Sequence, residues 1–144
     1  MIVAYIAGFQ VLAYVCLSLP PIYHKKKPEE ITTHPAWGII GSPIVEEVIF
    51  RGVPLIFYWM QPAAGILMAA LMSAAFVAFH NYQWLKGELV SNIVNFAWKA
   101  VIAILWTWVT FATGSIAWAI FLHSVNNTAG YVIYRVMRRR YEVE

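Results

Sequence analysis

The sequence predicts an all-helical membrane protein, a polytopic bundle of about five transmembrane helices. Hydrophobic residues make up 61% of the 144 residues and charged residues only 12%, whereas soluble domains are about 45–50% apolar and about 25% charged. The apolar residues also gather in runs close to the ~20 residues that a membrane helix needs. At this length we expect a single transmembrane domain over residues 1–144.

Five apolar runs, separated by prolines, polar loops and a Thr-Gly turn, predict the helices. The first run lacks the basic N-terminal region and small-residue cleavage site of a signal peptide, so we expect it to be retained. In the second run, Ser42 and Pro43 are residue types favoured at a helix start, and a start near Trp37 is the alternative. The expected helices are 1–19, 42–60, 63–80, 88–112 and 115–134, followed by a basic tail at 135–144.

The basic residues predict the orientation of the chain. Eight of the ten Lys and Arg residues fall in the 24–35 loop, the 81–87 loop and the C-terminal tail, which a five-helix chain places on one side. Cytoplasmic loops carry such an excess, so the N-terminus is expected outside and the C-terminus in the cytoplasm. Because these residues flank apolar segments and form no phosphate-binding stripe, no nucleic-acid partner is expected.

Three charged residues interrupt the apolar run PIVEEVIFRGVP at residues 43–54. A charge at the centre of a membrane helix costs about 2.5–3.5 kcal/mol on insertion scales. Glu47 and Arg51 are four residues apart in the favourable order for an ion pair. Glu46 is rotated from Glu47 by about 100° around the helix, so this carboxylate is left without a partner on its own helix, near the predicted cytoplasmic end.

Three further polar residues lie in or at the end of predicted helices. His80 ends the third helix, one turn after Phe76, and can be an interfacial residue or a functional one. His123 and Asn127 share one face of the fifth helix. They can form an interhelical contact, worth ~1–2 kcal/mol or less in membranes, or belong to a site.

The chemistry of these groups suggests hydrolysis. A carboxylate with a histidine can deprotonate a nucleophilic water, and histidine and asparagine N–H groups can stabilise an oxyanion. Because the groups come from three helices and lie toward the cytoplasmic half, we hypothesise cleavage of an amide bond near the cytoplasmic membrane face.

Three short motifs occur in order along the chain: EEVIFR at 46–51, FVAFH at 76–80 and HSVNN at 123–127. With them the sequence resembles the CAAX-type membrane endopeptidases, also called the abortive-infection or CPBP intramembrane protease family, over about residues 38–130. Each motif alone is weak, but three in order on separate predicted helices are a specific match.

The resemblance implies an intramembrane glutamate endopeptidase. It assigns Glu46 as the general base and His80 as the residue that orients or activates the water, while His123 and Asn127 stabilise the oxyanion. It implies no cofactor and no metal, and its partners are the lipid bilayer and a membrane-associated peptide or protein, prenylated for some family members. The supporting residues that it implies are Glu47, Arg51 and Phe76.

Two alternatives stay open at this stage. In a zinc-dependent membrane protease, Glu46, His80 and His123 would be three metal ligands with water as the fourth, although the HExxH helix is absent. In a non-proteolytic immunity or assembly protein, the polar residues would hold helices together. The enzyme readings require the four candidate catalytic side chains to meet.

Overall fold

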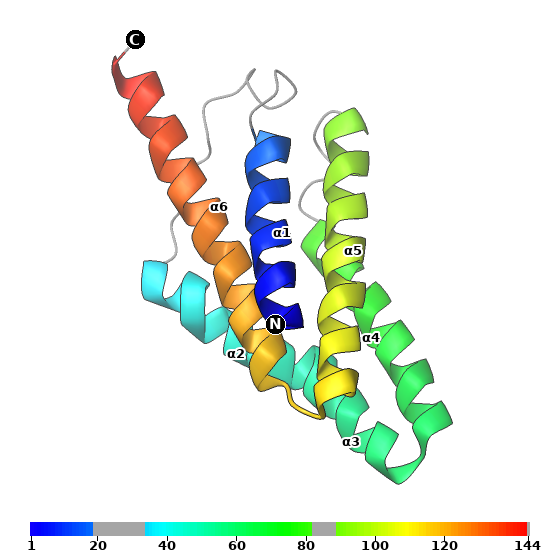
Figure 1. The fold of residues 1–144 in the computed structure, drawn as a ribbon. Helices are drawn as coiled ribbons and strands as arrows, with labels where there is room; N and C mark the ends of the chain where they lie inside the picture. Colours follow the sequence, from blue (N-terminus) through cyan, green and yellow to red (C-terminus); the bar gives the residue numbers. More distant parts are fainter. Residues whose placement is uncertain (19–33, 82–88, 144) are drawn as a thin grey trace. The chain divides into compact units, whose positions relative to one another are not determined.

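The described part of the chain consists of helices joined by short non-helical breaks (Figure 1). The computed structural model describes residues 1–18, 34–81 and 89–143, so most of the predicted loops 24–35 and 81–87 lies outside these ranges. Within them there is no strand, and the predicted all-helical class is confirmed. The elements are α1 (Ile2–Ser18), η1 (Trp37–Gly41), α2 (Ser42–Glu47), η2 (Val48–Gly52), α3 (Val53–Met60), α4 (Pro62–Asn81), α5 (Leu89–Thr113) and α6 (Ala117–Val143).

The chain divides into two compact units. The first unit contains Met1–Pro43 and Phe121–Glu144, and the second contains Ile44–Ile120. The second unit holds the EEVIFR and FVAFH motifs, whereas His123 and Asn127 belong to the first. The single transmembrane domain over residues 1–144 stays a prediction.

The helical stretch that ends at Met60 contains two widened turns, the π-helical segments η1 and η2. The Ser42 N–H bonds to the Trp37 carbonyl in the first, and the Val53 N–H bonds to the Val48 carbonyl in the second. In both, the donor and the acceptor are five residues apart, whereas in an α-helix they are four residues apart. Each turn is followed by a proline, in the sequences GSP at 41–43 and GVP at 52–54.

The prolines explain the widened turns. A proline inside a helix has no N–H, and its ring collides with the carbonyl four residues earlier. A wider turn in front of it relieves that collision. Ser42, with φ −59° and ψ −48°, therefore lies inside the helix and does not cap it. The predicted start at Ser42 is wrong, and the alternative start near Trp37 is confirmed.

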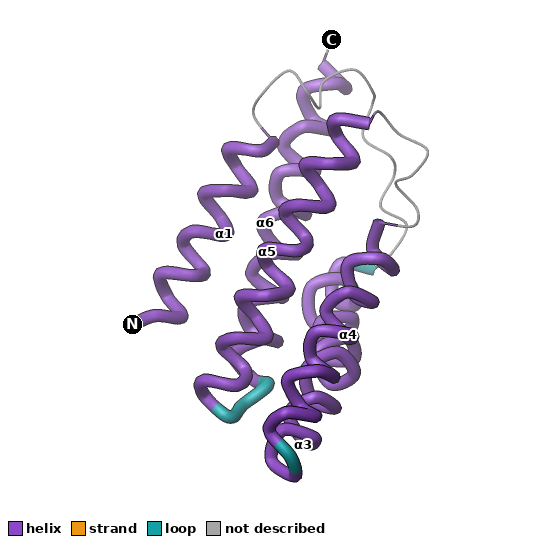
Figure 2. Tube along the Cα trace, turned by 90° about the vertical axis from the view of Figure 1, so that its right-hand side faces the viewer, coloured by secondary structure: helices purple, strands orange, loops and turns teal. Residues whose placement is uncertain are grey.

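In the second unit α3 packs on α4, and α4 packs on α5 (Figure 2). Gln61 has an extended backbone (φ −152°, ψ 106°) that ends α3, and Pro62 begins α4. At Gly65, α4 approaches α3 so closely that a Cβ there would lie 2.3 Å from the Cα of Tyr58. A side-chain hydrogen bond of 3.1 Å between Ser73 and Thr107 joins α4 to α5.

A short turn separates α5 from α6. Gly114 has φ +66°, a conformation that favours glycine. The Ser115 hydroxyl accepts the Ala117 N–H at 3.2 Å, which caps the start of α6. The helix then continues to Val143, so its predicted end at residue 134 is wrong. Arginine and methionine are good helix formers, and basic side chains suit a helix C-terminus.

Among the helices that the structure describes, two are long and apolar enough to cross a membrane. These are Pro62–His80 in α4 and Ile93–Thr113 in α5, whereas the apolar stretch Ile2–Ala13 of α1 is shorter. Large apolar side chains on α4 point outward, with Leu67 63% and Phe79 74% exposed. Such surfaces mark contact with lipid or protein. The count of about five spans stays a prediction.

The close contact at Gly65 gives a stability prediction. Gly65→Ala should lower the free energy of unfolding by about 1–3 kcal/mol, because its Cβ would overlap the backbone of Tyr58. Gly8→Ala is the control, since a Cβ at Gly8 meets nothing within 4 Å and alanine favours the helix. Thermal unfolding in detergent compares the two. Equal stability of both variants would contradict the close packing of α3 on α4.

Candidate active site

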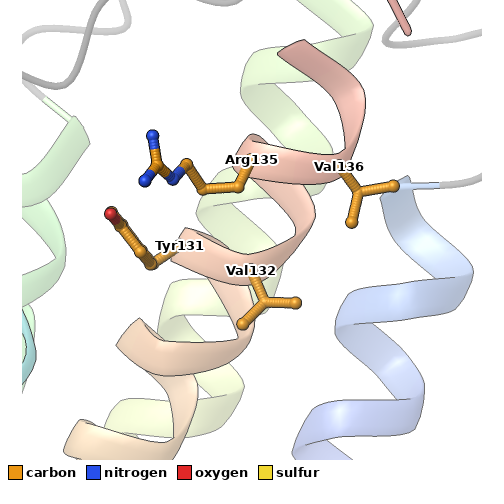
Figure 3. A pocket seen from close by; sticks show the side chains of 4 residues that line it. All are labelled: Tyr131, Val132, Arg135 and Val136. Atoms are coloured by element: carbon orange, nitrogen blue, oxygen red, sulfur yellow. The ribbon is translucent and has the colours of Figure 1, made fainter. Parts of the chain in front are cut away.

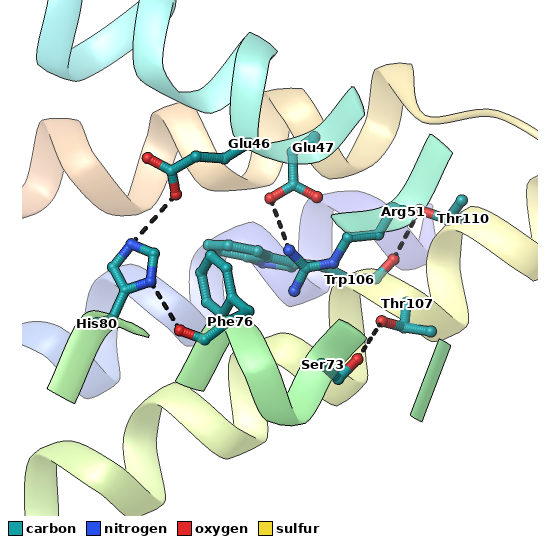
Figure 4. Close-up of polar contacts among 9 residues, drawn as sticks. All are labelled: Glu46, Glu47, Arg51, Ser73, Phe76, His80, Trp106, Thr107 and Thr110. Carbon is teal, nitrogen blue, oxygen red and sulfur yellow. Dashed lines mark hydrogen bonds and ion pairs between the residues drawn. The ribbon is translucent and has the colours of Figure 1, made fainter. Parts of the chain in front are cut away.

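A fully buried ion pair lies in the centre of the second unit (Figure 4). Arg51 Nη1 donates to Glu47 Oε1 at 3.1 Å, and both side chains are inaccessible to solvent. The ion pair predicted from their spacing is therefore confirmed. Isolated charges are very unfavourable in an apolar interior, so each residue makes the burial of the other possible.

Two aromatic rings complete the surroundings of Arg51. Its guanidinium carbon lies 4.4 Å from the Phe76 ring centroid and 5.4 Å from that of Trp106. Phe76 and Trp106 meet edge to face with centroids 6.0 Å apart, and both are buried. A cation over an aromatic face gains about 2 kcal/mol or more when it is desolvated. The rings therefore stabilise the part of the guanidinium that Glu47 does not reach.

Glu46, the residue next to Glu47, faces His80 of α4. Glu46 Oε2 lies 3.1 Å from His80 Nε2, and His80 Nδ1 lies 2.8 Å from the Phe76 carbonyl oxygen. A carbonyl oxygen only accepts hydrogen bonds, so Nδ1 carries a proton. The contact with Glu46 becomes an ion pair when Nε2 also carries a proton. The two side chains form an acid–base pair with a fixed imidazole orientation.

The two carboxylates differ in their access to solvent. The side chains of His80 and Glu46 are 20% and 19% exposed, whereas those of Glu47 and Arg51 are 0% exposed. Water can thus reach the Glu46–His80 pair and not the ion pair beside it. Glu46, which was expected to lack a partner on its own helix, has its partner on another helix.

The second unit therefore brings together five of the residues selected from sequence: Glu46, Glu47, Arg51, Phe76 and His80. Sequence reasoning missed Trp106. Its signal in the sequence is only its place in an apolar run of α5. The contact with Arg51 depends on helix packing.

In the first unit, Asn127 binds the widened turn η1. Asn127 Nδ2 donates to the Gly38 carbonyl at 2.8 Å. The Ser42 N–H is already bonded to Trp37, and the next N–H in that register would belong to Pro43, which has none. The Asn127 amide therefore supplies the hydrogen bond that Pro43 cannot. Its second N–H is left for another acceptor.

His123 lies one turn before Asn127 on α6 and is 3% exposed. Asn127 also accepts a hydrogen bond of 3.4 Å from Asn126 Nδ2. Asn127 thus makes a contact between helical segments, and its partner is Gly38. His123 and Asn127 belong to the first unit, and Glu46 and His80 belong to the second. The meeting of these side chains stays a prediction.

A cavity of about 240 Å³ lies farther along α6 (Figure 3). Its lining includes Tyr131 and Arg135, whose guanidinium carbon is 5.6 Å from the Tyr131 ring centroid, together with Val132 and Val136. None of these residues belongs to the predicted catalytic set. Among the described residues, no three His, Cys, Asp or Glu side chains gather into a group that could hold a metal ion.

The described helices thus carry exposed apolar side chains and, in the second unit, a carboxylate beside an imidazole. Residues 30–129, more than half of the chain, match the family of type II CAAX prenyl endopeptidase Rce1-like proteins. The chain belongs to this family, which confirms the resemblance drawn from the three motifs. The family is membrane-embedded and consists of proteases. No curated protein and no solved structure matches the chain.

The neighbouring carboxylates should respond differently to loss of charge. Glu47→Gln should destabilise the protein by about 3–5 kcal/mol, because Arg51 would remain buried without its counter-charge. Glu46→Gln, the matched control at the next position, should cost about 1 kcal/mol or less, since Glu46 is partly exposed. Chemical unfolding in detergent measures both. A larger loss for Glu46→Gln would contradict the assignment of the ion pair.

The contact between Asn127 and Gly38 predicts an energetic coupling with Pro43. Asn127→Ala should cost about 0.5–1.5 kcal/mol, the net value of one hydrogen bond. In a Pro43→Ala background this cost should shrink, because a backbone N–H becomes available to Gly38. Thr128→Ala, which removes a hydrogen bond within α6, should cost the same in both backgrounds. Strictly additive effects of Pro43→Ala and Asn127→Ala in a double-mutant cycle would argue against this account.

Proposed function

We propose that this protein is an intramembrane endopeptidase that hydrolyses a peptide bond with water activated by Glu46 and His80. The observation that carries the proposal is the 3.1 Å contact between these two side chains in a chain that belongs to a protease family. Their partial exposure gives water access to the carboxylate. The neighbouring ion pair leaves Glu47 and Arg51 in supporting roles.

The geometry supports a direct attack by water. The Phe76 carbonyl holds the proton on His80 Nδ1, so Nε2 is turned toward Glu46 and a water beside it. Glu46 accepts a proton from the water while the water oxygen forms a bond to the carbonyl carbon of the substrate. When the C–N bond breaks, Glu46 returns that proton to the leaving nitrogen. One water is consumed, and a new carboxyl and a new amine end form.

His123 and Asn127 are proposed as donors to the oxyanion of the tetrahedral intermediate. Oxyanion stabilisation requires N–H donors about 2.7–3.1 Å from the developing charge. Asn127 has one N–H engaged with Gly38, which fixes the direction of the other. The burial of His123 excludes water that would otherwise weaken its hydrogen bond to the oxyanion.

We further propose that the chain crosses the membrane about five times, with the C-terminus and the Glu46–His80 pair on the cytoplasmic side. The one-sided distribution of Lys and Arg supports this orientation. The substrate is a membrane-associated peptide or protein. The CAAX class, with a prenylated cysteine, is the first to test because the family is described by it.

Glu46→Gln should abolish cleavage and leave the protein folded. The purified protein in liposomes is given prenylated and unprenylated CAAX peptides, and new peptide ends are measured by mass spectrometry. Loss of the general base should lower the rate about 100- to 10,000-fold. Glu142→Gln, which removes a carboxylate near the C-terminus, should cleave at the wild-type rate.

Other results would support the alternatives. Full activity of Glu46→Gln would exclude Glu46 as the base. Activity that a chelator removes and zinc restores would indicate the zinc protease. A wild-type protein that cuts no peptide, although Glu46→Gln weakens its folding or its binding to another membrane protein, would indicate the immunity or assembly role.

A further inference from the structure

Arg51 presents a guanidinium that hydrogen bonds satisfy only in part. Nη1 is bonded to Glu47, whereas Nε and Nη2 are buried and have no hydrogen-bond acceptor among the residues that the structure describes. Buried polar groups without hydrogen bonds are unfavourable. The aromatic faces of Phe76 and Trp106 are therefore what holds this side of the cation in place.

Trp106 is the one of these two rings that lies on α5, away from the sequence motifs. It is 0% exposed, and its hydroxyl-bearing neighbour Thr110 bonds to its carbonyl at 2.9 Å, within the same helix (Figure 4). The indole contacts both Arg51 and Phe76. A smaller aliphatic side chain would leave both partners room to move.

Both partners of Trp106, Arg51 and Phe76, are connected to the Glu46–His80 pair. Arg51 lies on the helical stretch that carries Glu46, and its contacts with Phe76 and Trp106 join that stretch to α4 and α5. Phe76 packs on His80 with ring centroids 4.2 Å apart, and its carbonyl orients the imidazole. Movement of either partner changes the distance between Glu46 and His80.

We propose that Trp106 is a positioning residue that holds Arg51 and Phe76, and through them the contact between Glu46 and His80. As a statement about the reaction, this rests on the proposed endopeptidase function. As a statement about geometry, it concerns only the second unit. Misplacement of reacting groups by about 1 Å can cost ~100-fold in rate, so a residue without contact to the substrate can control turnover.

The test compares Trp106→Leu with Trp106→Phe, which retains an aromatic face. Trp108→Leu is the matched control, because Trp108 lies on the same helix and is 51% exposed. The first readout is the ¹⁵N spectrum of His80 in the folded protein without substrate, with Glu46→Gln as the reference for an imidazole without its carboxylate. The Nε2 signal of Trp106→Leu should move toward that reference, while Trp106→Phe and Trp108→Leu should stay near wild type.

The second readout is peptide cleavage. Trp106→Leu should lower kcat about 10- to 100-fold with KM changed less than about twofold, and Trp106→Phe should restore most of the activity. A wild-type His80 spectrum in folded Trp106→Leu would overturn the proposal, and so would an unchanged kcat. If Trp106→Leu does not fold, Trp106→Met, which also lacks an aromatic face, takes its place: a His80 signal moved toward the Glu46→Gln reference supports the proposal, and a wild-type signal overturns it.

The two readouts separate this proposal from the proposed function. If the wild-type protein cuts no peptide, the endopeptidase proposal fails. The His80 spectrum still decides whether Trp106 sets the Glu46–His80 contact, because that measurement requires no substrate.

Discussion

The second unit depends on how one buried cation is accommodated. Arg51 lies inside apolar helices, where an isolated charge would be very unfavourable. Its surroundings come from three directions: the Glu47 carboxylate on its own helical stretch, the Phe76 ring on α4 and the Trp106 ring on α5. Because Glu47 neutralises Arg51, the adjacent Glu46 is not drawn into that ion pair and is available to His80.

Adjacent carboxylates with different surroundings can take different roles on one helix. Glu47 is enclosed and bound to Arg51. Glu46 is partly exposed and faces the His80 imidazole. Separation of two titratable groups by their environments is a recurrent way to assign acid–base roles. Here a helical step of about 100° gives the two carboxylates different surroundings.

Local contacts of this fold could be predicted from sequence, and long-range ones could not. The Glu47–Arg51 pair and the stacking of Phe76 near His80 follow from four-residue spacing within a helix. The widened turns were not foreseen, because Ser42-Pro43 has the composition of a helix start and only the preceding chain shows that it lies inside one. Trp106 was missed because its role comes from packing of α5 against α4, which apolar periodicity does not specify.

The bond between Asn127 and Gly38 joins residues 89 positions apart, and this separation has a consequence for biosynthesis. A ribosome adding 5–20 residues per second needs about 4–18 s to travel from one to the other. During that interval the Gly38 carbonyl has neither the Pro43 N–H, which does not exist, nor the Asn127 amide, which has not been made. The beginning of the helix that carries Glu46 therefore acquires this hydrogen bond only after Asn127, within α6, has been synthesised.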